Sequence, residues 1–274
     1  TVQLAEKTAK AVTGSVEEWT GFLQSAARLY KYSYPEQLLI YAQRPDATAC
    51  ASYEIWNQTM RRYVRRGARG IALPDGAGAV RYVFDVADTG ARKSSREVKT
   101  WALDENNREA VAHALETQYG SAAKLGIAGQ LEEIAMQQSM DYWQWHQDEL
   151  RGIVDGSFLE GYDELNLEIA FRNTAAASVK YMLLSRCNLA REYQIEPEEL
   201  AGVLEWNTSA ASGALGSAVS ELSEGVLREI ERTIRQYERS QNYDERTDVY
   251  EERRVLDSRS DSSRTVGDTE QIRT

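Results

Sequence analysis

The sequence contains few of the residues from which catalytic and metal sites are usually built. Its 274 residues include two histidines and two cysteines. His113 and His146 are far apart, no His-Glu-x-x-His or Cys-x-x-Cys pattern occurs, and Gly76-Ala-Gly78 lacks the third glycine of a dinucleotide loop. No nucleophile stands beside a recognisable base. We therefore expect no metal ion and no cofactor, and we expect that the chain is not an enzyme on its own.

Long apolar segments are also missing. There is no run of about 18 apolar residues and no signal-peptide pattern, so neither a membrane span nor secretion is predicted. In a reducing, cytoplasmic location Cys50 and Cys187 are expected to be buried thiols rather than a disulfide. The chain begins at Thr1 and ends in a polar stretch, so we expect it to be part of a longer polypeptide.

Charge is abundant and unevenly distributed. Residues 61–99 contain ten Lys and Arg against four Asp and Glu, a local net charge of +6 in a chain of −11. The remainder therefore carries −17. Such segregation costs self-repulsion, and an anionic partner that binds the basic segment would relieve it.

Periodicity predicts an α+β fold, in which N-terminal helices pack on a small antiparallel β-meander and an all-α region follows. A capping box at Ser15–Glu18 opens a helix over 16–31, and Pro35 opens another over 36–43. Strands are predicted at 63–64, 70–73, 80–86 and 98–103. In the third of these, Val80, Tyr82, Phe84 and Val86 alternate with Arg81, Val83, Asp85 and Ala87, which predicts a strand with one buried face.

The rest of the chain has helical spacing, with helices predicted over 107–118, 127–154, 165–187, 197–204 and 217–237. Beyond Ser240 few apolar residues remain, so this end is predicted to be a disordered or solvated linker. The predicted organisation is an N-terminal lead (1–14), an α+β nucleic-acid-binding domain (15–103), an acidic helical domain (104–240) and a tail (241–274).

The basic segment has the composition of a nucleic-acid contact surface. Arginine can hold phosphate with its planar fork and can also stack on a base, and tyrosine rings stack on bases without sequence preference. The simplest alternative is that the arginines pair with the acidic helical region and the aromatic residues form core. The predicted contact residues are Arg61, Arg62, Arg65, Arg66, Arg69, Arg92 and Lys93 for phosphates, and Tyr32, Tyr34 and Tyr63 for bases. Further aromatic residues that could stack are Tyr30, Tyr53, Trp56 and Tyr82.

Several short motifs in this part of the chain occur together in one known family. Residues 34–48 (YPEQLLIYAQRPDAT), Trp56, the Val64–Ile71 turn and Val83–Val86 resemble the N-terminal domain of ArdC-type antirestriction proteins. Related domains occur in large multidomain proteins of Firmicutes conjugative elements, beside helicase or DNA-methylase modules. The resemblance covers about residues 15–103 and implies single-stranded DNA binding. ArdC-type proteins proper also carry a His-Glu-x-x-His domain, and this chain has no such motif.

Three functional hypotheses follow. The first is a non-catalytic single-stranded DNA-binding module of a mobile-element protein that acts in antirestriction or DNA transfer, with duplex DNA as a second possible ligand and other domains of a larger polypeptide as neighbours. The second is a protein–protein adaptor whose basic face docks on an acidic partner. The third is a degenerate enzyme domain retained for regulation. The sequence indicates no membrane partner and no oligomeric state.

Overall fold

The computed structural model describes residues 1–274 apart from 77, 191–192, 194 and 265–274, and for residues 242–264 it describes only the backbone. Three N-terminal helices come first: α1 (Val2–Val12), α2 (Val16–Arg28) and α3 (Tyr34–Gln43). The Ser15 side chain accepts a hydrogen bond from the Glu18 backbone N–H at 3.1 Å, as the capping box predicts. A second capping box, between Ser33 and Glu36, begins α3.

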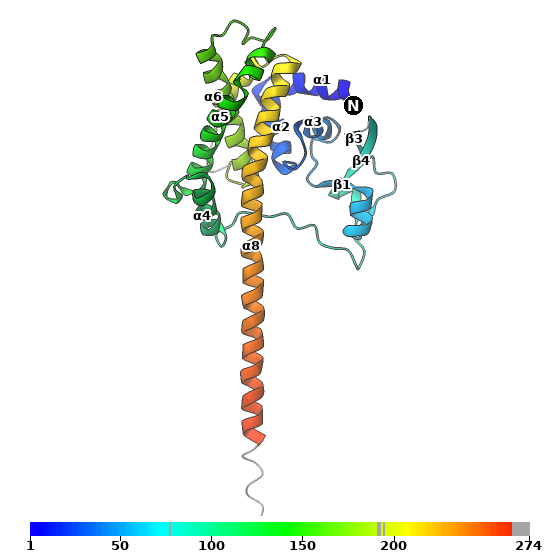
Figure 1. The fold of residues 1–274 in the computed structure, drawn as a ribbon. Coiled ribbons are helices and arrows are strands. Elements are labelled where there is room, and N and C mark those ends of the chain that lie inside the picture. Colours follow the sequence, from blue (N-terminus) through cyan, green and yellow to red (C-terminus); the bar gives the residue numbers. More distant parts are fainter. Residues whose placement is uncertain (77, 191–192, 194, 265–274) are drawn as a thin grey trace, which may run out of the picture.

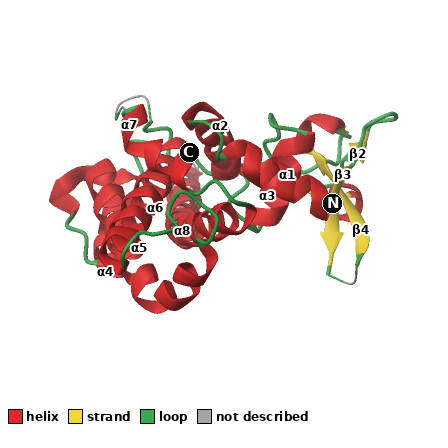
Figure 2. Ribbon diagram, turned by 90° about the horizontal axis from the view of Figure 1, so that it is seen from above, coloured by secondary structure: helices red, strands yellow, loops and turns green. Residues whose placement is uncertain are grey.

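The strands form two small antiparallel sheets at one side of the helices (Figures 1 and 2). The three-stranded sheet has the order β1 (Cys50–Ser52), β4 (Ala79–Asp85), β3 (Ile71–Asp75), and a two-stranded sheet pairs β2 (Tyr63–Val64) with β5 (Thr89–Gly90). A π-helix, Ile55–Thr59, and a 3-10 helix, Val86–Asp88, link them. The α+β fold class and the β3–β4 hairpin are confirmed.

The inner face of β4 is the one that carries Val83 and Asp85, and Tyr82 lies on the outer face. Val83 and Asp85 are buried, whereas Tyr82 is 56% exposed. Burial of Asp85 is possible because its carboxylate accepts the backbone N–H groups of Thr48 and Ala49 at 2.7 and 2.9 Å. The inner face packs on α3 in a small cluster: Leu29, Leu39, Ile40, Ala47, Ile71, Leu73 and Val83.

The strand predicted at 98–103 is wrong. This segment pairs with no strand, and it is held instead by Trp101, which is buried. The Trp101 indole N–H donates to the Tyr30 hydroxyl at 3.1 Å, and the Arg186 guanidinium lies 3.4 Å from the indole ring centre. One large side chain therefore anchors the segment without a hydrogen-bonded ladder.

The remainder is helical: α4 (Arg108–Tyr119), α5 (Gly126–Ile153), α6 (Glu164–Arg186), α7 (Pro197–Leu200) and α8 (Ser209–Arg264), with 3-10 helices at Ala123–Leu125 and Ala201–Glu205.

Helix α8 starts eight residues before the predicted start at 217 and continues through 241–264, where disorder or a linker is predicted. No glycine or proline lies between Gly225 and Gly267, and Glu, Arg and Gln favour helix, which accounts for the continuation. The last part of the predicted tail, 265–274, lies outside the described residues. Helix α8 extends well beyond the body of the molecule (Figure 1).

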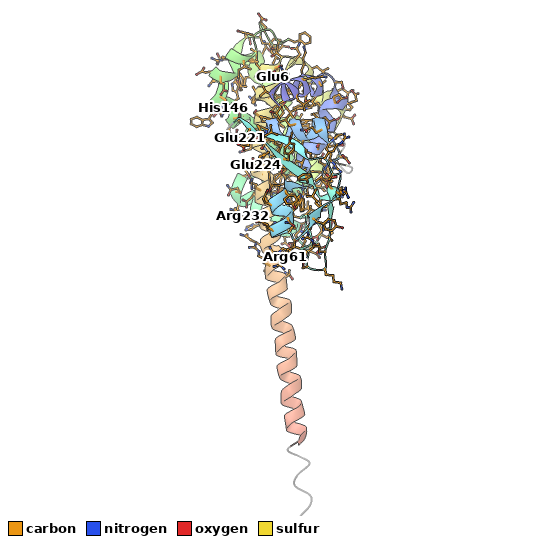
Figure 3. The ribbon with its side chains drawn as sticks, turned by 90° about the vertical axis from the view of Figure 1, so that its right-hand side faces the viewer. Glu6, Arg61, His146, Glu221, Glu224 and Arg232 are labelled. Carbon is orange, nitrogen blue, oxygen red and sulfur yellow. The ribbon has the colours of Figure 1, made fainter. Side chains whose placement is uncertain are left out.

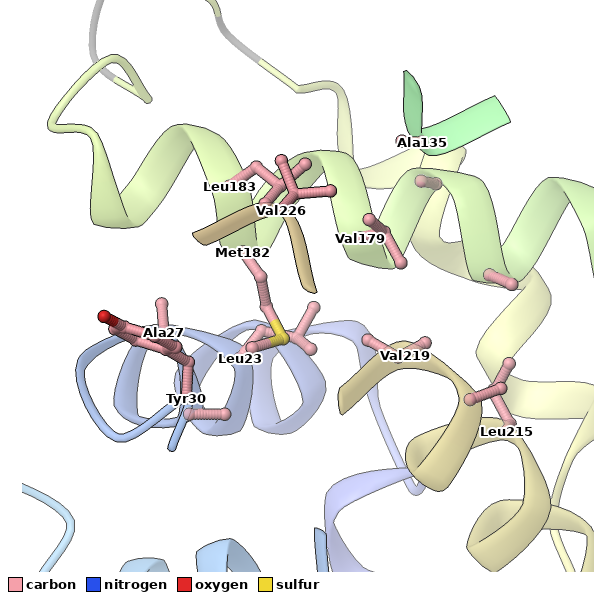
Figure 4. Packing of buried hydrophobic residues seen from close by; sticks show 14 of the residues in the cluster. Leu23, Ala27, Tyr30, Ala135, Val179, Met182, Leu183, Leu215, Val219 and Val226 are labelled. Atoms are coloured by element: carbon pink, nitrogen blue, oxygen red, sulfur yellow. The ribbon is translucent and has the colours of Figure 1, made fainter. Parts of the chain in front are cut away.

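One large core joins the two predicted domains. Leu23 and Ala27 of α2, and Tyr30 just after this helix, pack against Val179 and Met182 of α6, and Leu215, Val219 and Val226 of α8 close the same cluster (Figure 4). The boundary predicted at residue 103 therefore passes through a shared core. Among the described residues, the buried members of the small cluster under the sheet all lie within 15–103, with Ala5 of α1 packed against them.

Both cysteines are free thiols, and burial raises the pKa of each to about 12. Among the described residues, no helix is both long and apolar enough to cross a membrane.

Candidate nucleic-acid interface

The arginine-rich segment runs from the end of the π-helix through β2 into the loop before β3, and Figure 3 shows Arg61 at the lower edge of the body. Arg61 adopts a left-handed conformation with φ of 54°. Two hydrogen bonds fix this turn: the Arg62 backbone N–H donates to the Trp56 carbonyl at 2.8 Å, and the Ser95 hydroxyl donates to the Arg61 carbonyl at 2.6 Å. The chain direction at Arg61 is therefore set by its neighbours.

A second basic loop lies against this turn. The Arg96 backbone N–H donates to the Met60 carbonyl at 2.9 Å, and Arg92 donates to the Asn57 side-chain oxygen at 3.3 Å. The Arg92 guanidinium also lies 5.6 Å from the centre of the Tyr63 ring. The structure thus brings Arg92, predicted from sequence, together with Arg61 and Tyr63.

The charges of this surface are not neutralised within the described part of the chain. None of the seven predicted phosphate-binding residues forms an ion pair there, whereas Arg44 pairs with Asp88 and Arg81 pairs with Glu36 at 2.5 Å. Arg62 is half-buried, and its Nε donates to the Thr89 hydroxyl at 2.8 Å. The other six are exposed: Arg61, Arg65, Arg66, Arg69, Arg92 and Lys93.

The three tyrosines predicted to stack on bases differ in their exposure to solvent. Tyr63 is 43% exposed, and its ring packs over Gly90, where an added Cβ would lie 2.3 Å from the ring. The prediction for Tyr34 is wrong, because this ring is 4% exposed in the main core. Tyr32 is half-buried, and its hydroxyl donates to the Cys50 carbonyl at 2.8 Å.

The outer face of the three-stranded sheet offers further rings beside the basic segment. Tyr82 on β4 is the most exposed, and the half-exposed Phe84 follows on the same face. Gly70 lies directly over them: a Cβ there would meet Tyr82 Cβ at 3.0 Å and Phe84 Cζ at 3.2 Å. This close approach brings the backbone at Gly70, the residue that follows Arg69, against Tyr82. Tyr53, also exposed, precedes the π-helix.

The sequence names Tyr82 and Tyr53 as aromatic residues that could stack, but the predicted contact set omits both. The alternation in β4 cannot tell which face is outward. Tyr82 faces outward because Asp85, on the opposite face of the strand, turns its carboxylate inward to the backbone N–H groups of Thr48 and Ala49, and no local feature of the sequence reveals this.

Several residues of the short sequence motifs hold the sheet in place. The Gln43 amide donates to and accepts from the backbone of Ala72, both at 3.0 Å, which occupies the outer edge of β3. Arg44 pairs with Asp88, and the Trp56 indole N–H donates to the Phe84 carbonyl at 2.8 Å. These contacts give a structural reason for the spacing of the motifs.

In the described ranges, no group of three or more His, Cys, Asp or Glu side chains could hold a metal ion. Comparisons of the chain with family models, curated proteins and solved structures gave no match.

Proposed function

We propose that the chain is a non-catalytic module that binds single-stranded DNA and belongs to a mobile-element protein active in antirestriction or DNA transfer. In this proposal Arg61, Arg65, Arg66, Arg69 and Arg92 hold phosphates, with Lys93 and the half-buried Arg62 nearby. Tyr63 and Tyr82 stack on bases. The module works in the cytoplasm and is carried by a larger polypeptide with helicase or methylase modules.

One observation carries the proposal: six cationic side chains of two segments in contact, 61–69 and 92–96, are exposed, and none forms an ion pair within the described residues. In a chain with a net charge of −11, carboxylates are plentiful elsewhere. A surface that served only to stabilise the fold would be expected to use some of them. Unpaired guanidinium groups beside exposed aromatic rings favour a ligand that supplies both phosphates and bases.

The resemblance to ArdC-type N-terminal domains supports the same function by a separate route. It rests in part on residues that fix the sheet, such as Gln43, Arg44 and Asp85. It also includes the Val64–Ile71 turn, so Arg65 and Arg66 belong both to the resemblance and to the exposed surface.

The double variant Arg65→Ala/Arg66→Ala tests the proposed surface. Each phosphate contact to a single strand contributes about 0.7 to the slope of log K against log salt, so removal of two contacts should lower the slope by roughly 1.4. Affinity should fall for every oligonucleotide sequence. Fluorescence anisotropy with labelled oligo-dT across a salt series measures both quantities.

The matched control is Arg228→Ala/Arg232→Ala on α8, which removes the same charge from exposed positions away from the sheet. It should leave the slope unchanged. If both double variants bind oligo-dT like the parent chain, the surface is wrongly assigned. Failure of the parent chain to bind any oligonucleotide would favour the adaptor hypothesis.

A further inference from the structure

A cationic cavity lies between the end of α2, the segment around Trp101 and the end of α6. It has a volume of about 610 Å³, and a second hollow of about 210 Å³ shares Arg28, Thr48, Thr100 and Arg186 with it. This is the size range of small-molecule sites in proteins. Apart from Tyr32 at the smaller hollow, none of the residues proposed to contact DNA lines either part.

The lining of the cavity is strongly positive. Five cationic side chains face it against a single carboxylate among the described residues, a net charge of +4 within an acidic chain. These six are Arg28, Lys31, Lys99, Arg186, Arg235 and Glu231.

The one carboxylate is already engaged by two of the cations. Glu231 contacts Lys31 Nζ at 2.5 Å and Arg235 Nη2 at 2.8 Å, and it accepts the Tyr30 hydroxyl. It therefore leaves the guanidinium groups of Arg28 and Arg186 without an acidic partner in the described part of the chain.

The guanidinium groups of Arg28 and Arg186 are held in position by neutral acceptors. Arg28 donates to the carbonyl oxygens of Ala47 and Pro45, each at 3.0 Å. Arg186 donates to the Trp101 carbonyl at 2.9 Å and stacks on the Trp101 ring. Each guanidinium carries five N–H groups, so further donors remain on both. Burial lowers the pKa of Arg186, as expected for a cation withdrawn from water without an adjacent carboxylate.

We propose that this cavity binds the phosphate group of a ligand of about mononucleotide size. Arg28 and Arg186 present planar donor forks that match phosphate oxygens, with Lys99 at the rim. Neutral polar side chains, including Gln24, Thr48 and Asn188, line the larger part and suit the remainder of such a ligand. The phosphate comes either from a free nucleotide or from the 5′ end of a bound strand.

Calorimetric titration of the full chain with ADP and with inorganic pyrophosphate tests the proposal, and adenosine serves as the uncharged comparison. We expect binding of both anions and none of adenosine. Arg186→Gln should weaken binding about tenfold or more, because a charge-assisted hydrogen bond is lost. Since Arg186 also supports Trp101, its variant is checked by thermal unfolding. Lys99→Gln, at a 76% exposed side chain that cannot affect the core, should weaken binding severalfold.

The proposed DNA surface supplies the control. Arg65→Ala/Arg66→Ala should leave ADP and pyrophosphate binding unchanged, so loss of one activity can be separated from loss of the other. A 5′-phosphorylated oligo-dT that binds more tightly than its 5′-hydroxyl form, with the difference abolished by Arg186→Gln, would identify the strand end as the source. If neither anion binds and the 5′ phosphate has no effect, or if binding is indifferent to both Arg186→Gln and Lys99→Gln, the proposal is overturned.

Discussion

At the scale of single residues, two tyrosines of the N-terminal half have opposite roles. Tyr34 is enclosed: its ring meets Phe22 edge-on at 5.7 Å between centres, its hydroxyl donates to the Ser212 carbonyl at 3.3 Å, and it packs where Gly216 has no side chain. Tyr82 lies on the outer face of the sheet with more than half of its surface exposed. Tyr34 therefore contributes to stability, whereas Tyr82 is available to a ligand.

This difference predicts opposite effects of truncation. Tyr34→Ala should lower the free energy of unfolding by about 3–5 kcal/mol, the usual cost of deleting a large buried aromatic side chain. Tyr82→Ala should change stability by less than about 0.5 kcal/mol and weaken oligo-dT binding by roughly 1–3 kcal/mol. Urea denaturation and anisotropy measure the two effects. Unimpaired DNA binding by Tyr82→Ala would remove this ring from the proposed interface.

At the scale of elements, Glu231 ties α8 to the N-terminal helices. Burial alone would raise the pKa of this carboxyl, but hydrogen bonds from Lys31, Tyr30 and Arg235 and the charge of Lys31 outweigh burial and hold the pKa at about 2. Lys31 and Tyr30 follow the end of α2, while Arg235 lies one turn along α8. The contact therefore joins segments that are distant in sequence.

A depressed carboxyl pKa gives stability a defined pH dependence. The carboxylate contributes its full stabilisation of the fold above the pKa that it has in the unfolded chain, about 4.3. This stabilisation is lost as the pH falls through the folded-state pKa of about 2. The contribution of Glu231 should be on the order of 2–3 kcal/mol at pH 7 and roughly half of that at pH 3. Urea denaturation of the parent chain and of Glu231→Gln at both pH values measures it. A difference between the two proteins that does not shrink at pH 3 would contradict this assignment.

Elements with clear local signals could be predicted from the sequence. Ser15 and Pro35 mark helix starts, and the alternation after the Gly76–Gly78 turn marks the hairpin. The inward face of β4 could not be predicted, because it depends on backbone N–H groups around Thr48 that are distant in sequence. The apolar spacing around Trp101 predicts a strand. That spacing does not reveal that the Trp101 ring is instead buried against Arg186.

The candidate site could be predicted only in part, because some of its features have a local signal in the sequence and others depend on the fold. Clustering of arginine is visible in the sequence, and the structure leaves Arg65, Arg66 and Arg69 exposed. Whether an aromatic side chain is exposed depends on the fold, so Tyr34 and Tyr82 could not be distinguished. The cavity at Arg186 has no local signal, because α2, the Trp101 segment and α6 meet there only in three dimensions.

At the scale of the whole molecule, the shared core makes the N-terminal region dependent on the helices that follow. The Trp19 indole N–H donates to the Ser178 hydroxyl of α6 at 2.9 Å, and both residues are buried. Leu23 of α2 and Tyr30, which follows that helix, belong to the same core as Val219 of α8. An isolated fragment of residues 15–103 would expose these apolar faces to water.

We therefore predict that the fragment 15–103 does not fold cooperatively by itself. Loss of the α6 and α8 contacts uncovers several large apolar side chains, each worth roughly 1.5–3 kcal/mol when fully buried. Circular dichroism during thermal unfolding compares the fragment with the full chain. A fragment that unfolds in a sharp transition near the melting temperature of the full chain would show that the sheet and its small cluster are sufficient.

In the proposed function, the exposed cationic surface near Tyr63 and Tyr82 recognises single-stranded DNA. Fluorescence anisotropy of the full chain with labelled oligo-dT and with a duplex of matched length, across a salt series, tests this recognition. We predict tighter binding to the single strand, with an affinity that falls steeply as salt increases. Equal or tighter binding to the duplex, or no binding of either at low salt, would contradict the account.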